Sequence, residues 1–346
     1  MSALPLVISQ ATDADAMAWN AFVDAHVHGS TFHRWEWRGV YRDVYGHDCP
    51  YLVARRGNEL AGVLPLVRVK SLVFGHYLVS LPYVSYGGPL GDAEGERALT
   101  AAPAELAQGA KLVELRTRQP VTTDSLVPVN RKITVLLDLV PGDYEATFKR
   151  FDSKLRSQVR RGEKEGLVVK FGREHAAAYH RVFTEHMRDL GSPAHGLRFF
   201  ERLADALGER AWIGVAYLGE TPVAAGFGIE NGREVEISWA SALRRYQKIS
   251  PNMTLYGAFI RRACEQGFDV FNFGRCTAGS GTHKFKRQWN SRDESLPWYQ
   301  YGEGTAEGSA QKPPDQAAFG LAVSIWRRLP VSLTARVGSQ IIAGIP

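Results

Sequence analysis

Residues 264–289 read CEQGFDVFNFGRCTAGSGTHKFKRQW and decide how the fold is interpreted. Gly267 ends a helix here, because glycine takes the left-handed conformation that follows a helix more easily than other residues. The alternation of apolar and polar residues over 270–273 predicts a short, half-buried strand. A glycine-rich loop follows and ends in a dense group of cations. We predict that this stretch carries the functional centre, since such a loop brings backbone and positive charge close to a polar ligand.

The cationic end of this loop supplies the candidate catalytic residues. Lys286 is the candidate cation, because an ammonium held in a partly dry cleft stabilises negative charge that develops in a reaction. His283 is the candidate base, because histidine can take a proton near neutral pH. Phe285 and Trp289 alternate with the basic residues, which indicates that part of the loop packs against a core. A fully solvated basic loop is the alternative interpretation.

The pattern of helix, glycine and strand occurs twice at a constant offset. Residues 106–115, LAQGAKLVEL, align with residues 264–273, CEQGFDVFNF. We therefore predict an α+β fold of two tandem units, each a mixed and mostly antiparallel sheet flanked by helices, with hairpins at Gly57 and Gly219. The predicted parts are an N-terminal domain over 1–142, a C-terminal domain over 143–301 that opens with a basic inter-domain helix over 143–166, a flexible linker over 302–320 and an amphipathic segment over 321–346.

Composition restricts the class of protein. The chain has 346 residues, of which 45% are hydrophobic and 23% charged, as in a soluble globular protein with room for two cores. Its formal charge of +6 favours anionic partners. Three widely spaced cysteines without a CxxC pair indicate neither a disulfide framework nor a metal site. The sequence shows neither a signal peptide nor an apolar run of about 18 residues, so we expect a cytoplasmic protein.

A second basic stretch, LRRYQKISPN over 243–252, leads into a predicted helix over 253–267. A helix N-terminus presents unpaired N–H groups and the positive end of the helix dipole, so with nearby cations it can hold a phosphate. A basic loop that only caps a helix is the alternative. Together with the glycine-rich loop, this stretch supplies the candidate donor-binding residues Arg244, Arg245, Lys248, Asn252, Gly274, Arg275, Gly281 and Thr282.

Candidate acceptor-binding residues lie in two other places. The basic helix carries Arg156 and Arg160 one turn apart, where they could bind phosphate groups. This helix also raises the alternative of a non-catalytic protein that binds nucleic acid or another polyanion. In the N-terminal half, Trp37, Tyr83 and Tyr86 have the aromatic and polar character suited to a sugar or another substrate, with core positions as the alternative.

Taken together, these motifs resemble one protein family. The second half of the chain is similar to FemAB-type proteins, a branch of the GNAT-like acyltransferase superfamily. The similarity extends over nearly the whole chain and is greatest to the FemAB-like proteins that accompany PEP-CTERM/exosortase exopolysaccharide systems. The residues that carry it are Trp239, Arg245, Tyr246, Ser250, Pro251, Asn252, Leu255, Tyr256, Gly267, the FNFGRC stretch over 271–276, Gly281, Thr282, Phe285 and Lys286.

The resemblance implies two tandem GNAT-like domains and the transfer of an acyl or aminoacyl group to an amine. The implied acceptor is a cell-envelope or exopolysaccharide precursor, either a small molecule or a saccharide or lipid-linked compound. The implied donor is acyl-CoA or aminoacyl-tRNA, with tRNA serving only as the carrier of the donor group, and no metal is implied. Lys286 falls where the family places a cation beside the activated carbonyl, which fits a role in stabilising the tetrahedral oxyanion.

The chain departs from the family pattern at two positions. Asn272 stands where an aspartate is common, which excludes an aspartate base there. Cys276 stands where a serine is usual, and a nucleophilic cysteine is a minor alternative. Asn272 also raises the alternative of a degenerate pair of GNAT domains that acts as an interaction module.

The C-terminal segment over 321–346 regains apolar character after a stretch rich in Gly, Ser and Pro. Arg327, Arg328 and Arg336 lie among its apolar residues. An amphipathic segment of this kind docks either on the protein itself or on a membrane surface, and docking on the protein is the more ordinary outcome. We therefore include a peripheral contact with the inner membrane among the expectations.

Overall fold

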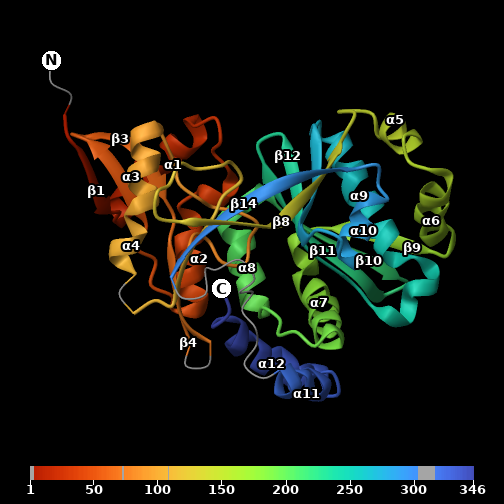
Figure 1. Ribbon diagram of the computed structural model, residues 1–346. Coiled ribbons are helices and arrows are strands. Elements are labelled where there is room, and N and C mark those ends of the chain that lie inside the picture. Colours follow the sequence, from red (N-terminus) through yellow and green to blue (C-terminus); the bar gives the residue numbers. More distant parts are fainter. Residues whose placement is uncertain (1–3, 72–73, 108, 303–315) are drawn as a thin grey trace. The chain divides into compact units, whose positions relative to one another are not determined.

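The computed structural model describes residues 4–71, 74–107, 109–302 and 316–346 (Figure 1). The chain folds into two compact units. Both units combine strands in sheets with flanking helices, so the predicted α+β class is confirmed. Unit 1 comprises Met1–Lys132, Ser295–Lys312 and Ala343–Pro346, and unit 2 comprises Ile133–Glu294 and Pro313–Ile342.

Unit 1 contains a four-stranded sheet in the order β1-β2-β3-β6 and, in a second sheet, the strand order β4-β5-β7-β14. The turn at Gly57, with a φ of +61°, joins the antiparallel strands β2 and β3 and confirms the predicted hairpin. The elements are β1 Leu6–Gln10, α1 Ala16–Ala25, α2 Glu36–Tyr45, β2 Leu52–Arg56, β3 Glu59–Leu64, β4 Val67–Ser71, β5 Gly75–Val79, β6 Leu90–Gly91, α3 Ala93–Ala101, α4 Pro103–Leu106, β7 Leu112–Arg116 and β14 Arg292–Gly302.

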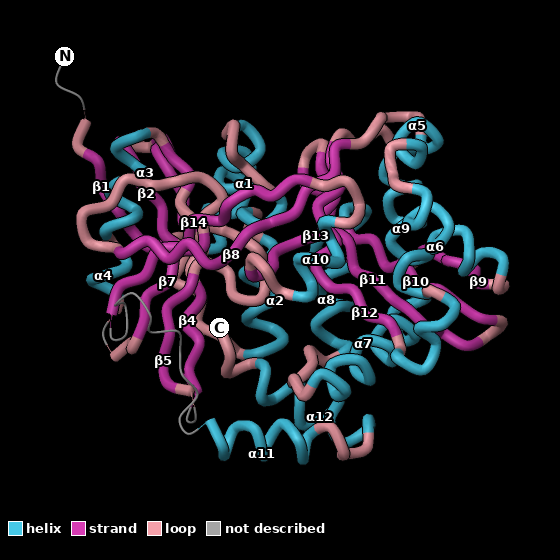
Figure 2. Tube along the Cα trace, turned by 45° about the vertical axis from the view of Figure 1, so that its right-hand side comes forward, coloured by secondary structure: helices cyan, strands magenta, loops and turns pink. Residues whose placement is uncertain are grey.

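Unit 2 has the strand order β8-β13-β12-β11-β10-β9. The antiparallel strands β10, β11 and β12 run side by side (Figure 2), and the turn at Gly219 confirms the second predicted hairpin. The elements are β8 Val127–Asp138, α5 Tyr144–Lys149, α6 Ser153–Lys164, β9 Leu167–Phe171, α7 Ala176–Leu190, α8 Leu197–Leu207, β10 Ala211–Leu218, β11 Thr221–Asn231, β12 Glu234–Ala242, α9 Pro251–Glu265, β13 Val270–Thr277, α10 Gly281–Arg287, α11 Gln316–Trp326 and α12 Val331–Ile342.

The unit boundary lies at 132/133, whereas the sequence predicted a boundary at 142/143. Val135 and Leu137 of β8 are part of the core of unit 2, which explains why the end of this strand belongs there. The predicted basic helix over 143–166 is divided into α5 and α6, because the Asp152 side chain accepts a hydrogen bond from Leu155 N and starts a new helix. Most of the predicted linker lies outside the described residues, and α11 begins at Gln316.

The sheet of unit 2 is covered by helices on both faces. Phe259 of α9 packs with Ile237 of β12 in one core cluster. On the other face, Phe200 of α8 contacts Phe227 of β11 and Trp239 of β12, with ring centroids 5.6 Å apart in each pair. A register shift between β11 and β12 separates Ile237 from Trp239, so these two residues of one strand face opposite sides of the sheet.

Each unit contains a parallel strand pair preceded by a left-handed glycine. In unit 1, Gly109 has a φ of +73° and β7 pairs with β5 at three positions. In unit 2, Gly267 has a φ of +81° and β13 pairs with β12 at three positions. The two aligned stretches over 106–115 and 264–273 therefore share the predicted order of helix, glycine and strand.

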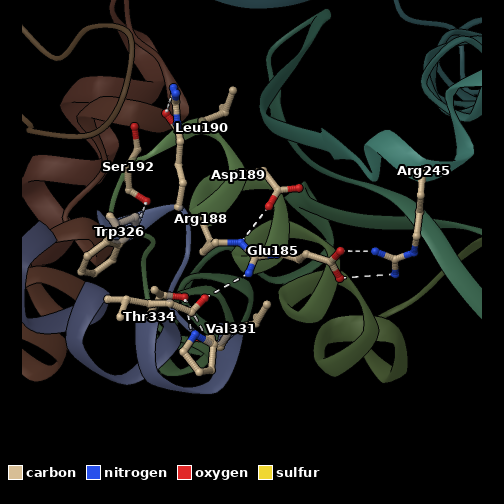
Figure 3. A network of polar contacts seen from close by, with 12 residues as sticks. Glu185, Arg188, Asp189, Leu190, Ser192, Arg245, Trp326, Val331 and Thr334 are labelled. Carbon is tan, nitrogen blue, oxygen red and sulfur yellow. Dashed lines mark hydrogen bonds and ion pairs between the residues drawn. The ribbon is translucent and has the colours of Figure 1, made fainter. Parts of the chain in front are cut away.

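The C-terminal helices α11 and α12 belong to unit 2 and pack beside α7 (Figure 3). The Arg188 guanidinium donates to the Leu329 carbonyl at 3.0 Å, and Trp326 Nε1 donates to the Ser192 carbonyl at 3.2 Å. The structure thus shows the docking on the protein that the sequence left as one of two outcomes. Among the described residues, no helix has both the length and the apolar content that a membrane crossing requires.

Candidate functional site

Asn272 is the centre of a buried polar cluster in unit 2. Its side-chain oxygen accepts hydrogen bonds from Thr134 Oγ1 at 2.5 Å and from the Gly274 backbone N–H at 2.7 Å. Its amide nitrogen donates to Glu234 Oε1 at 2.7 Å and to Glu236 Oε2 at 3.2 Å. Asn272 and both glutamates are buried. One amide therefore links β8, β12 and β13 and satisfies carboxylates that would be unfavourable in the interior without partners.

This polar cluster lies where two parallel strands separate. The last paired position of β12 and β13 is Glu236 opposite Asn272. Directly beyond it, Gly274 has a φ of +72°, and a Cβ added there would lie 3.0 Å from the Ile237 carbonyl oxygen. Glycine is required at this position by both the backbone conformation and the close approach. The carboxyl ends of neighbouring parallel strands are also a common place for a ligand to bind in mixed folds.

Lys286 is joined to this polar cluster through Gly274. The residue lies in α10 and is only 4% exposed. Its ammonium donates to the Gly274 carbonyl at 2.6 Å and to the Arg275 carbonyl at 3.0 Å. An ammonium has three N–H donors, and within the described part of the chain the third has no acceptor. One donor of a buried cation thus remains for a ligand oxygen.

The surroundings of Lys286 bring its ionisation close to neutral pH. Burial lowers the pKa of Lys286 to about 8, because the charged form loses contact with water. The nearby Cys276 and Glu236 oppose this shift in the pKa, and the positive charge of Arg275 adds to it. The lysine is therefore an ammonium at pH 7 and titrates within the range of an enzyme assay.

His283 was predicted as the base, and the structure occupies both of its ring nitrogens. Nδ1 accepts a hydrogen bond from the Gly279 backbone N–H at 2.9 Å, and Nε2 lies 3.0 Å from both carboxylate oxygens of Asp293. Nδ1 needs its lone pair for the first bond, so Nε2 carries the proton and donates to Asp293. A role as base stays a prediction, and this arrangement does not favour it.

The predicted donor-binding residues fall into two groups. Gly274 and Arg275 contact Lys286 directly, and Gly281 and Thr282 form the first turn of α10, whose N-cap Ser280 accepts a hydrogen bond from His283 N. The second group lies on the 3₁₀ helix over 244–249 and the start of α9. Its members are Arg244 and Lys248, which are exposed, Asn252 at the start of α9, and Arg245.

Arg245 differs from its neighbours because it is already paired. Its guanidinium forms an ion pair with the Glu185 carboxylate and lies 5.2 Å from the centre of the Tyr246 ring. Binding of a donor phosphate by Arg245 would require this ion pair to open. Ser250, which precedes α9, has a φ of +56° and gives the helix no side-chain cap. The backbone N–H groups of the first turn of α9 are therefore not capped by this side chain.

The predicted acceptor-binding residues do not form one group. Arg156 donates to the carbonyls of Lys149 and Phe151, at and just after the end of α5. Its positive charge therefore caps the C-terminus of that helix. Arg160 is exposed, and its guanidinium lies 5.1 Å from the centre of the Phe148 ring. Binding of an acceptor or of another polyanion by these arginines stays a prediction.

The predicted aromatic residues of unit 1 occupy core positions. Trp37 and Tyr86 are fully buried, and Trp37 Nε1 donates to the Thr31 carbonyl at 2.9 Å. Tyr83 is also buried, and its hydroxyl lies 3.3 Å from His47 Nε2. These positions agree with the alternative of core aromatics, and contact with an acceptor stays a prediction that the burial does not favour.

Sequence reasoning missed Glu234 and Glu236, which are both essential to the polar cluster. The signal was present in the run EVEIS over 234–238, where two acids alternate with Val235 and Ile237. Two glutamates on one face of a strand are normally assigned to solvent, and their burial here depends on Asn272 from another strand. Within the described residues, no group of three or more histidine, cysteine, aspartate and glutamate side chains could hold a metal ion.

A separate cavity of about 540 Å³ also lies in unit 2. The Arg262 guanidinium lies over the rings of Phe171 and Trp212 in its lining, at 4.9 and 4.8 Å. Trp212 Nε1 donates to the Glu230 carboxylate at 2.6 Å. The lining shares no residue with the polar cluster around Asn272, so we do not assign the cavity to the candidate site.

The second unit is similar to a known class of domain. Residues 149–287 match the family model described as an acetyltransferase (GNAT) domain. These residues include the part of the polar cluster that lies between Glu234 and Lys286. The matched part of the chain is therefore similar to GNAT-type acetyltransferase domains, in line with the sequence resemblance.

Solved structures extend the similarity to both units. A crystal structure of FemX is 14% identical, covers 85% of this chain and 97% of its own length, and superimposes with a TM-score of 0.62. The C-terminal domain of a putative lysylphosphatidylglycerol synthetase from Agrobacterium fabrum is 12% identical, with coverages of 90% and 95% and a TM-score of 0.57. The structure of L-PGS from Bacillus licheniformis is 14% identical, with coverages of 92% and 97% and a TM-score of 0.54.

At these identities, the likeness to solved structures shows a shared fold. A sequence search against curated proteins gives no significant match. The names of these relatives do not mention exopolysaccharide or PEP-CTERM systems, and that assignment stays a prediction.

Proposed function

We propose that this chain is an N-acyltransferase or aminoacyltransferase that forms an amide on an amine of a cell-envelope or exopolysaccharide precursor. The observation that carries the proposal is Lys286, a buried ammonium with one free N–H donor at the point where β12 and β13 separate in a GNAT-like domain. A fixed cation in a site of low polarity stabilises a developing oxyanion much better than a solvated one does.

The proposed reaction follows from these groups. The acceptor amine attacks the carbonyl carbon of the donor, a C–N bond forms, and the carbonyl oxygen becomes an oxyanion next to the Lys286 ammonium. The bond to the leaving group then breaks, which is a C–S bond in acyl-CoA or a C–O ester bond in aminoacyl-tRNA. The proton of the amine goes to a base and finally to the leaving thiolate or ribose oxygen.

Glu236 is the base that the geometry supports best. Its carboxylate is buried, accepts hydrogen bonds from Asn272 Nδ2 and Ser238 Oγ, and lies close enough to Lys286 to raise the pKa of the ammonium. A base beside the oxyanion-stabilising cation can take the proton of the amine while the carbonyl is attacked. His283 is less well placed because both of its ring nitrogens are already used.

Donor binding is assigned to the loop over 243–252 and the start of α9. Arg244, Lys248 and Asn252 could bind a phosphate there, which is present both in CoA and at the end of tRNA. The donor therefore remains either acyl-CoA or aminoacyl-tRNA. We expect the protein to act in the cytoplasm or at the inner surface of the membrane, where both donors and envelope precursors are found.

The first experiment identifies the donor and tests Lys286 together. Mass spectrometry of small molecules released from the purified chain is expected to show a bound acyl-CoA or a related donor. Donors are then tested with hydroxylamine as a small surrogate amine, and the transfer rate of Lys286→Met is compared with that of Lys284→Met. Lys284 is the matched control because it is exposed and lies two residues away in the same helix. Loss of an oxyanion donor is expected to slow transfer about 10²–10³-fold in Lys286→Met only.

Two results would contradict the proposal. Equal transfer rates for Lys286→Met and wild type would remove the assigned role of the ammonium. An absence of turnover with every donor, combined with steeply salt-dependent binding of nucleic acid, would favour the polyanion-binding alternative. An absence of both would favour a degenerate pair of domains that only binds a partner.

A further inference from the structure

The two C-terminal helices present a face that the proposed transfer reaction does not use. α11 docks on unit 2 through one side. Trp326 Nε1 donates to the Ser192 carbonyl just after α7, at 3.2 Å, and the Arg327 guanidinium donates to the Leu190 carbonyl at the end of α7, at 3.1 Å. Val323 lies against Gly191. Positions 323, 326 and 327 are three and four residues apart, so they occupy one side of the helix.

The opposite side of α11 is apolar and exposed. Leu321 is 63% exposed and Ile325 is 52% exposed, and the two are four residues apart. Arg328 follows three residues after Ile325 and is also exposed. This side of α11 and the turn that follows it therefore combine two large apolar side chains with one cation.

α12 has the same division into a docked side and an exposed side. Thr334 and Gly338 are buried one turn apart, and a Cβ on Gly338 would lie 3.0 Å from the Ala194 backbone nitrogen. Leu333, which is 44% exposed, and Arg336 lie on the exposed side. We call Leu321, Ile325, Arg328, Leu333 and Arg336 together the C-terminal face.

The charge of the C-terminal face has one sign. Residues 316–346 contain no aspartate and no glutamate, so the charged side chains of this face are arginines. The neighbouring acids of α7 are already neutralised, since Asp189 pairs with Arg188 at 2.7 Å and Glu185 pairs with Arg245 (Figure 3). Exposed apolar side chains together with arginines are complementary to a surface that has negative charge on the outside and an apolar layer beneath it.

We propose that the C-terminal face binds the surface of a membrane that contains anionic phospholipids. Leucine and isoleucine side chains would enter the boundary between headgroups and acyl chains, and the arginines would contact lipid phosphates. The contact is peripheral, because none of the described helices is suited to cross the membrane. The proposal does not rest on the transfer reaction, since binding requires only this face, but it would keep a lipid-linked acceptor close to the enzyme.

The test is cosedimentation of the full chain with vesicles of phosphatidylcholine, with and without phosphatidylglycerol. Wild type is expected to bind only the vesicles that contain phosphatidylglycerol, and added salt is expected to weaken binding. The charge reversal Arg328→Glu with Arg336→Glu is expected to weaken binding at least about tenfold. Lys70→Glu with Arg97→Glu is the matched control, because it changes the net charge equally at two exposed positions of unit 1 and is expected to bind as wild type does.

A second pair of variants tests the apolar part of the C-terminal face. Leu321→Ser with Ile325→Ser is expected to reduce vesicle binding, whereas Met17→Ser with Val27→Ser, at two exposed apolar positions of unit 1, is expected to have no effect. Circular dichroism melting curves confirm that each variant is folded. Failure of wild type to bind the anionic vesicles would overturn the proposal, as would equal losses in the C-terminal and control variants. A wild-type dimer that Leu321→Ser with Ile325→Ser converts to a monomer would instead assign the face to a second copy of the chain.

Discussion

Strand β7 of unit 1 and strand β13 of unit 2 occupy corresponding places in the aligned stretches, and their polar residues are used in opposite ways. In β7, Glu114 accepts a hydrogen bond from Arg116 Nε at 2.7 Å, and both side chains are buried. In β13, Asn272 takes the position aligned with Glu114, and Gly274 takes the position aligned with Arg116. Unit 1 therefore pairs a buried carboxylate with a cation of the same strand, whereas the two aligned positions of β13 carry no charge.

The strands that pair with β7 and β13 also differ in charge at the corresponding position. Val79 of β5 lies opposite Glu114 in the parallel pair of unit 1, and Glu236 of β12 lies opposite Asn272 in that of unit 2. In unit 2, the carboxylate comes from Glu236 of β12 and the ammonium comes from Lys286 of α10. This ammonium keeps one free N–H donor. In the pair of β7, one strand supplies both the carboxylate and the cation. In the polar cluster of unit 2, Lys286 keeps a donor with which it can act on a ligand.

Glu114→Gln is expected to have the largest effect on stability. It removes the carboxylate that neutralises Arg116 in the interior of unit 1, and an uncompensated buried charge costs about 3–5 kcal/mol of unfolding free energy. Urea unfolding of Glu114→Gln is compared with that of Glu59→Gln, an exposed position in the same unit that should change little. Equal midpoints for the two variants would show that the pair in β7 is not a structural element.

Asn272→Asp is expected to destabilise unit 2 by about 2–3 kcal/mol, because it removes two donors and adds a third carboxylate to the polar cluster. Crowded carboxyls have a raised pKa in the folded state, so the folded form binds more protons and the loss of stability grows as the pH rises. Urea unfolding at pH 6 and pH 8 measures this difference. Asn58→Asp, in an exposed turn, should show no such pH dependence.

Glu236→Gln is expected to lower the transfer rate about 10²-fold with a smaller effect on stability, because glutamine can still accept from Asn272 but cannot take the proton of the amine. Glu234→Gln is the matched control, since Glu234 shares the same Asn272 amide. Single-turnover rates of the two variants distinguish a base from a structural acceptor. A larger loss in Glu234→Gln would move the role of base to that residue.

The pH dependence of transfer is expected to show the smallest effect. Lys286 must be protonated to stabilise the oxyanion, and its pKa is lowered to about 8. The rate with hydroxylamine, which is neutral in this range, should therefore fall about tenfold per pH unit above that pKa. Lys286→Arg keeps its charge and should not show this fall. A rate that rises through the same range would indicate that the lysine acts as a base.

Much of the fold could be predicted from local sequence. Gly109 and Gly267 both have the expected positive φ and are both followed by strands, since the conformational freedom of glycine is a local property. The burial of Lys286 agrees with the aromatic neighbours Phe285 and Trp289, and Trp289 is fully buried.

The partners in the site could not be predicted in the same way. The two carbonyls that hold Lys286 depend on how β13 ends at Gly274, and the partner of His283 is Asp293, ten positions along the chain. The burial of Glu236 depends on a hydrogen bond from Asn272, which lies in another strand and could not be identified as its partner from local sequence. Trp37 illustrates the converse difficulty, because an aromatic residue suited to a ligand is equally suited to a core, where the structure places it.

The most direct test of this account is the pKa of Lys286 itself. A titration of the chain labelled with ¹³C at lysine Cε, followed by NMR and assigned by the signal lost in Lys286→Arg, gives this value without knowledge of the donor or acceptor. We expect a pKa of about 8 for Lys286, well below its ordinary value. A value close to the ordinary 10.5 would mean that the ammonium is solvated, and it would contradict the proposed role in transfer.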